Sequence, residues 1–155
     1  MNTGVRADGG FVFRSEWSQL PAAPERVYAV LAAVEDYPRW WPQVRRARRL
    51  DETSGELTCR SLLPYDLVFV MYQELEDPAR LVLRARMTGD LNGTSQWTIA
   101  ADGDGARAVF DEDVSVGSGL LRAAGRLFRP ALKFNHDRMM RAGETGLRAH
   151  LLSGA

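Results

Sequence analysis

A run of strand-length segments between residues 44 and 116 constrains the fold of this chain more than any other feature. Short breaks rich in Gly, Pro, Asp or Ser separate the segments, and these are the residues that turns favour. Parallel strands would need crossovers of roughly a dozen residues or more, and the breaks leave no room for them. The run therefore predicts an antiparallel meander, with strands at residues 44–50, 56–63, 66–76, 80–89, 92–101 and 106–116.

One further strand and a short helix precede this run. Residues 11–18 alternate with a period of two, which is typical of a half-buried strand. Pro24 stands where a first helical residue would, ahead of apolar side chains at helical spacing up to Val34. The stretch EDYPRWWP at residues 35–42 then sets two prolines around three aromatic rings. It predicts a turn with a short helix, packed by its rings.

The last segment with a clear pattern is helical. Residues 119–152 have helical periodicity, which we expect to be interrupted or kinked near Pro130. At about 100° per residue, one side of this helix carries an apolar stripe with two polar members. The stripe consists of Leu121, Phe128, Leu132, Asn135, His136, Met139, Gly143, Gly146 and His150. Its two glycines lie where a helix backbone could closely approach a sheet. The order of elements along the chain predicts an α+β domain in which an antiparallel sheet covers the terminal helix.

Composition excludes several classes of function. The 155 residues suit one domain, residues 1–155, and 20 basic residues balance 20 acidic ones, which disfavours nucleic acid as a partner. The longest apolar stretch, Val27–Val34, is too short to span a membrane, and residues 1–10 contain no apolar core of a signal peptide. We therefore expect a cytoplasmic protein without integral membrane association. One Cys and two His disfavour a disulfide and a zinc site.

Common catalytic motifs are missing as well. The chain contains no phosphate-binding Gly-rich loop, no G-x-S-x-G, no H-E-x-x-H and no C-x-x-C. Phosphoryl transfer, serine hydrolysis and zinc hydrolysis are therefore disfavoured, and we expect neither a metal nor a cofactor.

Several short motifs, in their order along the chain, carry a family resemblance. They are Trp17, Pro24-Glu25-Arg26-Val27-Tyr28, Asp36-Tyr37-Pro38-Arg39-Trp40-Trp41-Pro42, Leu63-Pro64-Tyr65, Gly89-Asp90-Leu91-Asn92-Gly93 with Trp97, Asn135-His136-Asp137, and Gly143 to Leu147. Together they resemble the polyketide cyclase/dehydrase branch of the START-like (SRPBCC) superfamily. The resemblance implies a helix-grip fold, in which a seven-stranded antiparallel sheet curves around the long C-terminal helix and leaves a deep ligand cavity between them. Members include aromatases and cyclases of poly-β-ketone chains and carriers of hydrophobic molecules.

Glu112 is the strongest candidate for chemistry. In the strand 106–116 it shares a face with Ala108, Phe110, Val114 and Val116, so a carboxyl group stands in an apolar row. Facing the cavity, it would have a raised pKa and could act as a general acid or base on a ketone or hydroxyl. A bulge, a shift of register or a salt bridge to a neighbouring Arg would instead turn it outward.

His136 and Asn135 are the other polar candidates, and they share the inward stripe of the helix. They could donate hydrogen bonds to a carbonyl group, and His136 could exchange a proton near neutrality; alternatively, they satisfy backbone groups where the helix crosses the sheet. We assign catalytic roles to Glu112 and His136. The inward rows predict a cavity of several hundred cubic ångströms, and the ligand-binding candidates are Phe13, Trp40, Trp41, Ser61, Leu83, Met87, Trp97, Phe110, Leu132, Asn135 and Met139.

Two surface features have charged side chains. Arg84 and Arg86 alternate with an inward row and are expected in solvent. The run Arg45, Arg46, Arg48 and Arg49 could bind an acidic carrier protein or phosphate, although a solvated strand edge is the simpler interpretation.

Tyr37, Trp40 and Trp41 could form the cavity mouth or a structural aromatic cluster.

Two functions follow from these observations. The first is a cofactor-independent aromatase or cyclase that folds a poly-ketone chain and assists aldol closure and loss of water. The alternative is a non-catalytic carrier that binds or sequesters a polyketide-, polycyclic- or lipid-like molecule. A third, weaker hypothesis is a protein-binding surface at Val68, Val70 and Tyr72. The expected partner is a hydrophobic small molecule, and a homodimer or an acyl carrier protein stays open.

Overall fold

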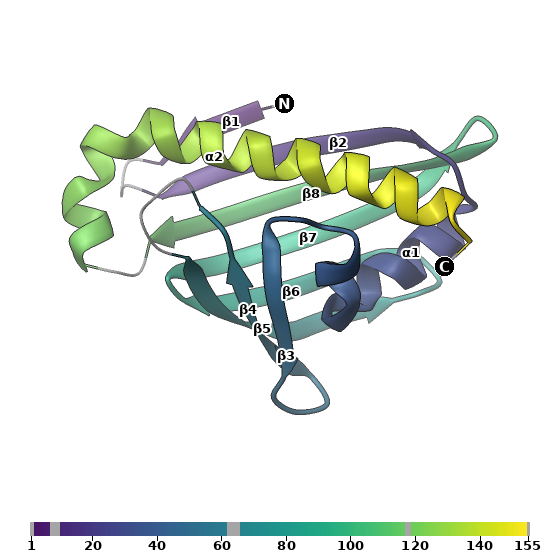
Figure 1. Cartoon of the computed structure of the whole chain (residues 1–155), viewed down its shortest axis with the longest axis horizontal. Helices are drawn as coiled ribbons and strands as arrows, with labels where there is room; N and C mark the ends of the chain where they lie inside the picture. Colours follow the sequence, from purple (N-terminus) through teal and green to yellow (C-terminus); the bar gives the residue numbers. More distant parts are fainter. Residues whose placement is uncertain (1, 7–9, 62–65, 117–118, 155) are drawn as a thin grey trace.

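The chain forms one curved antiparallel sheet with a long helix lying along it (Figure 1). The computed structural model describes residues 2–6, 10–61, 66–116 and 119–154, and for residues 119–129 it describes the backbone alone. The elements are β1 (Asn2–Val5), β2 (Phe11–Leu20), α1 (Pro24–Ala32), the 3₁₀ helix η1 (Val34–Arg39), β3 (Val44–Arg49), β4 (Ser54–Cys59), β5 (Leu67–Asp77), β6 (Val82–Gly89), β7 (Leu91–Asp102), β8 (Gly105–Val116) and α2 (Gly119–Leu152).

The strand order confirms the predicted meander. The sheet runs β1-β2-β8-β7-β6-β5-β4-β3, and every pair is antiparallel. The seven predicted strands are present, and β1 adds an eighth at the edge beside β2. Residues 2–5 have no alternation of apolar and polar side chains, so the sequence pattern did not indicate this strand. One boundary was wrong: β4 ends at Cys59 instead of residue 63.

Alternating burial along the central strands defines the inner, concave face. In β2 the side chains of Phe11, Phe13 and Trp17 are buried while their neighbours are exposed or half-buried. β8 repeats the alternation, and Phe13 pairs with Glu112 across the two strands. The register therefore places a carboxyl group beside an aromatic ring on the face that α2 covers.

Helix α2 was expected to be interrupted or kinked near Pro130. It continues through Pro130 as one helix, and its first turns curve away from the line of the rest (Figure 1). Its buried face also lies about one residue further along than the predicted stripe, because the helix packs on the Trp40–Trp41 segment as well as on the sheet. Buried positions along the helix are His136, Met140, Gly143, Leu147 and Leu151, of which the predicted stripe lacked Met140, Leu147 and Leu151.

Gly143 and Gly146 bring α2 against the segment after η1. A Cβ atom on Gly146 would lie 1.7 Å from the backbone oxygen of Trp40, and one on Gly143 would lie 2.5 Å from the ring of Trp41. The Nε1–H group of Trp41 donates a hydrogen bond to the backbone oxygen of Met139 at 2.9 Å. The expectation that these glycines face the sheet was therefore wrong, because two tryptophans stand between this part of the helix and the strands.

Replacing Gly146 by Ala is expected to destabilise the protein. Alanine favours an isolated helix by about 1 kcal/mol over glycine, but here its methyl group would collide with backbone that cannot rotate away. We expect the free energy of unfolding, measured by urea denaturation, to fall by about 1–3 kcal/mol. Thr145→Ala, at an exposed neighbouring position, is the control. A Gly146→Ala variant more stable than wild type would contradict the close packing described above.

Candidate functional site

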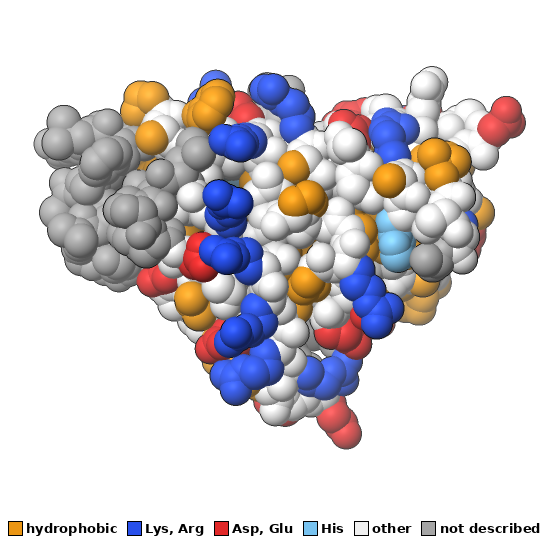
Figure 2. Space-filling view, in the orientation of Figure 1, with side chains coloured by type: hydrophobic (Ala, Val, Ile, Leu, Met, Phe, Trp, Pro, Cys, Tyr) orange, Lys and Arg blue, Asp and Glu red, His pale blue; other side chains and the backbone are white. Residues whose placement is uncertain are grey.

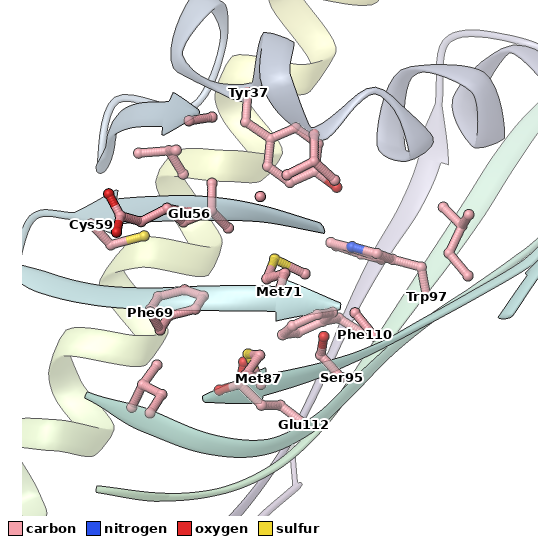
Figure 3. A pocket seen from close by; sticks show the side chains of 18 of the residues that line it. Tyr37, Glu56, Cys59, Phe69, Met71, Met87, Ser95, Trp97, Phe110 and Glu112 are labelled. Carbon is pink, nitrogen blue, oxygen red and sulfur yellow. The ribbon is translucent and has the colours of Figure 1, made fainter. Parts of the chain in front are cut away.

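A cavity of about 240 Å³ lies between the concave face of the sheet and α2. Figure 3 shows aromatic, methionine and carboxyl side chains from several strands pointing into it. Its volume lies slightly below the range of roughly 300–1,000 Å³ that is usual for ligand pockets, and below the several hundred cubic ångströms expected. Seven of the eleven ligand-binding candidates come from the predicted inward rows, and all seven line the cavity: Phe13, Leu83, Met87, Trp97, Phe110, Leu132 and Met139.

Aromatic rings form one wall of the cavity. The ring of Trp97 lies 4.6 Å from that of Phe110 and 4.8 Å from that of Trp17. Trp41 contacts Trp17 edge-on at 5.5 Å and also lines the cavity. Such contacts hold the rings in fixed orientations, so the wall is a rigid apolar surface.

The aromatic segment 37–41 divides between the two predicted roles. Tyr37 lines the cavity, its hydroxyl donates a hydrogen bond to the backbone oxygen of Leu31 at 2.5 Å, and burial raises its pKa. Trp40 lies behind Trp41, with their rings 5.4 Å apart, and it does not line the cavity. Trp40 therefore belongs to the structural cluster that packs on α2, and its placement argues against the ligand-binding role that the sequence suggested.

Glu112 lies on the cavity side of β8. Its side chain is 11% exposed, and Figure 3 shows it beside Met87. Burial raises the pKa of this carboxyl group to about 7, because an ionised carboxylate loses hydration that the apolar wall does not replace. The alternative prediction, in which Glu112 faces solvent, is therefore wrong.

His136, on α2, lies next to Glu112. Its Nε2 atom lies 3.7 Å from Oε1 of Glu112, which is too far for a hydrogen bond. The imidazole stacks on the ring of Phe13, with centroids 3.9 Å apart and an interplanar angle of 11°. Neither ring nitrogen has a hydrogen-bond partner among the described residues. Burial lowers the pKa of His136 to about 4, so acid and base both stay uncharged between about pH 4 and 7.

The remaining polar candidates have different positions. Asn135 lines the cavity, whereas Ser61 follows the end of β4 and is not part of the wall. The ligand-binding assignment of Ser61 depended on a strand that continued to residue 63. Cys59 is buried in the wall, and burial, the charge of Glu112 and that of Asp66 raise the pKa of its thiol to about 12. Leu63-Pro64-Tyr65 lies outside the described residues.

The cavity reaches the surface between η1, the β3–β4 turn and β5. Exposed residues that line it there include Glu35, Arg49, Thr53, Gln73 and Leu75. Nη2 of Arg49 lies 3.2 Å from Oε1 of Glu35, so an ion pair spans this opening. We call this opening the rim.

The arginine run on β3 is a solvated strand edge. β3 is the last strand of the sheet, and Arg45, Arg46, Arg48 and Arg49 are all exposed. Figure 2 shows basic side chains interspersed with acidic ones on this face. Three of the four form ion pairs, with Asp66, Glu56 and Glu35. Arg84 and Arg86 are also exposed, as expected.

Part of the cavity wall was not predicted from the sequence. Phe69 and Met71 of β5 line the cavity, and so does Leu31 of α1. Residues 67–72 are apolar on both faces of the strand, and Val68, Val70 and Tyr72 were placed on the second face, but the residues of the opposite row were not named as cavity lining. On the outer row, Val68 is 39% exposed, and Tyr72 packs under the guanidinium of Arg86 at 4.4 Å.

Metal-binding clusters and membrane-spanning helices are two further features on which the described residues bear. In that part of the chain no three side chains of His, Cys, Asp or Glu come together as metal ligands do. Within the same residues, every helix is too short or too polar to cross a membrane.

Comparisons with known proteins agree with this architecture. A protein-family model described as "Polyketide cyclase / dehydrase and lipid transport" matches residues 15–151. A search of curated protein sequences found no significant match.

Solved structures share the fold at low sequence identity. TTHA0849 from Thermus thermophilus is 19% identical with a TM-score of 0.80, covering 93% of this chain and 99% of that one. The Zhui aromatase/cyclase from a Streptomyces species is 17% identical with a TM-score of 0.73, covering 91% and 92%. A START superfamily protein from Mycobacterium smegmatis is 17% identical with a TM-score of 0.67, covering 94% and 99%. At these identities the similarity establishes the helix-grip fold.

The pKa values of Glu112 and His136 predict opposite effects of pH on stability. A raised carboxyl pKa stabilises the fold below pH 4.5, and this contribution is lost as the pH rises to about 7. A lowered imidazole pKa stabilises the fold above pH 6.5, and this contribution is lost as the pH falls to about 4. Each of these two pKa shifts changes the free energy of unfolding by about 3 kcal/mol. The two changes have opposite signs, so they largely cancel in wild type. In urea denaturation, Glu112→Gln should gain stability relative to wild type as the pH rises from 4.5 to 7, and His136→Gln should lose it.

The matched control for this experiment is Glu56→Gln. Glu56 also lines the cavity, but it pairs with Arg48 at 3.3 Å near the surface. Its stability difference from wild type should not follow the Glu112→Gln curve. Parallel curves for wild type and Glu112→Gln across this pH range would refute the buried, uncharged carboxyl.

Proposed function

The chain belongs to the polyketide cyclase/dehydrase and lipid transport family, and on that premise we propose that it binds a hydrophobic polyketide-, polycyclic- or lipid-like molecule in its cavity and acts on it as a cofactor-independent cyclase or aromatase. The ligand would enter at the rim and lie along the aromatic wall. Burial of flat apolar surface against Trp97, Phe110 and Trp41 would supply most of the binding free energy.

One observation carries the catalytic part of this proposal: a buried carboxyl group and a buried imidazole lie 3.7 Å apart in an otherwise largely apolar interior. The pKa of Glu112, about 7, makes its carboxyl group both donor and acceptor of protons near neutrality. His136, 3.7 Å away, is a neutral base that can exchange a proton with Glu112 after a small rotation of either side chain.

Aldol closure needs only such proton transfers once the chain is folded. A carbon–carbon bond forms between an enol carbon and a ketone carbon, the ketone oxygen takes the proton of Glu112, and the enol hydroxyl gives up a proton that returns to the pair. Loss of water then breaks a carbon–oxygen bond: the hydroxyl leaves with a proton from Glu112, and the neighbouring carbon releases one. The protons balance over the cycle, and the cavity wall contributes by holding the reacting carbons together.

A carrier without catalysis is the second candidate. The separation of 3.7 Å between Glu112 and His136 favours it, because the pair is not joined by a hydrogen bond. In that case the cavity would serve binding alone.

Replacing Glu112 by Gln should separate turnover from binding. We expect wild type to bind the uncharged dye Nile red and to redirect the products that a linear poly-β-ketone forms spontaneously in water. Glu112→Gln keeps the shape of the side chain but has no exchangeable acid proton, so the rate of directed cyclisation should fall by about 10²-fold or more with dye binding retained. Product analysis by chromatography and dye fluorescence measure the two effects.

Two further variants make the result decisive. Leu83→Trp should fill the cavity and abolish dye binding, whereas Val82→Trp, next to it on β6 and outside the wall, should not. Dye binding in wild type with no effect on the ketone would favour the carrier. Turnover in Glu112→Gln equal to wild type would remove Glu112 from catalysis.

A further inference from the structure

Resting on the proposed binding function, we propose that Glu112 is the specificity-determining residue of the cavity, and that it selects uncharged ketones on a flat apolar body and rejects carboxylates. The consequence is a narrower ligand class than hydrophobic molecules in general. Fatty acids and other anionic lipids would bind poorly, although their tails would fit an apolar wall.

The position of Glu112 makes it a recognition group. Its backbone pairs with Phe13 of β2 on one side and with Ser95 of β7 on the other. The titratable groups that face it are His136 from α2 and, from β4, the thiol of Cys59, whose pKa its charge affects. In the described part of the chain, His136 is the basic side chain that the structure places in contact range of Glu112, and no guanidinium is paired with it.

Hydrogen-bond chemistry then ranks the ligands. A protonated carboxyl group donates one hydrogen bond, which a ketone oxygen can accept without any charge entering the cavity. A hydrocarbon of the same shape would cover Glu112 and leave this donor without a partner, which is unfavourable. A ligand carboxylate would lose its hydration and bring a negative charge beside a second acidic group, and like charges disfavour each other strongly away from water.

Cations at the rim do not offer a simple alternative anchor for a carboxylate. Arg48 pairs with Glu56 at 3.3 Å, and Arg49 pairs with Glu35 at 3.2 Å. Two further arginines of the lining lie away from the rim: Arg84 of β6, which donates a hydrogen bond to the neutral amide of Gln96 at 2.9 Å and keeps its charge, and Arg60, exposed just beyond β4. A carboxylate bound at either of them would appear in the titrations as naphthoate affinity and would count against the inference.

Proton dependence follows from the same geometry. As the pH rises through about 7, Glu112 loses the proton that a ketone accepts, and two acceptors then face each other. Ketone affinity should therefore be high below neutrality and low above it. The imidazole of His136, with its pKa lowered to about 4, stays neutral through this range and does not reverse the effect.

Three naphthalene probes of matched shape test the inference. 1-Acetonaphthone is a neutral acceptor, 1-naphthoate is an anion of nearly the same shape, and naphthalene lacks the polar group. Titration calorimetry on wild type at about pH 5.5 should show acetonaphthone binding about tenfold tighter than naphthalene and at least as much tighter than naphthoate. At about pH 8.5 the affinity for acetonaphthone should be about tenfold lower than at pH 5.5.

Three variants assign the effect to one residue. Glu112→Gln still donates a hydrogen bond, so it should keep the preference for the ketone and lose its pH dependence. Glu112→Met, similar in length but apolar, should bind acetonaphthone and naphthalene equally. Glu74→Gln, the same change at an exposed carboxyl group of β5 that does not line the cavity, should behave as wild type.

The outcomes separate this inference from the proposed function. If none of the probes binds, the proposed binding function fails. If naphthalene and acetonaphthone bind equally at both pH values, or naphthoate binds as tightly as the ketone, the cavity is a binding site but Glu112 does not select its ligand. A pH dependence that survives in Glu112→Gln would also overturn the inference.

Discussion

The close contact between α2 and the Trp40–Trp41 segment is the constraint on which the site depends. Gly143 and Gly146 allow the helix backbone to lie against these two residues, and the Trp41 indole donates to the carbonyl of Met139. His136 precedes Gly143 by seven residues, which is about two helical turns and keeps it on the same face. Anchoring the helix at the glycines therefore places the imidazole over Phe13 and behind Glu112.

The interior that results favours uncharged forms of both polar groups. Burial raises the pKa of Glu112 and lowers that of His136, so an acid and a base lie side by side with no ion pair between them near neutrality. An apolar pair at these positions would pack without any such cost to stability. The proposed function gives this buried polar pair a role that offsets its cost to the fold.

Sequence patterns predicted the fold well where one face of a strand is polar. The alternation in residues 11–18 and 106–116 was sufficient to place Phe13 and Glu112 on the inner face. In β5, where both faces are apolar, Val68, Val70 and Tyr72 were placed on the second face, but the opposite row with Phe69 and Met71 was not named as part of the cavity wall. In α2 the period was right, but the buried face was displaced by about one residue, since nothing in the pattern revealed that tryptophans from another segment would share it.

Details of the site were predictable only in part, for related reasons. Composition marked Trp40 and Trp41 equally, and only the three-dimensional packing separates the one that lines the cavity from the one behind it. Ser61 was assigned to the wall because its strand was expected to continue, yet β4 ends two residues earlier. The distance between Glu112 and His136 joins a strand and a helix far apart in the sequence, so no local pattern could give it.

The ionisation of Glu112 is the central claim, and NMR measures it most directly. In protein with ¹³C-labelled glutamate carboxyl groups, comparison with Glu112→Gln assigns the resonance, which is then followed through a pH titration. The account predicts that this carboxyl group titrates near its raised pKa of about 7. Titration of Glu112 near the ordinary glutamate pKa of about 4.3 would contradict it, because the carboxyl group would then be hydrated and charged at neutral pH.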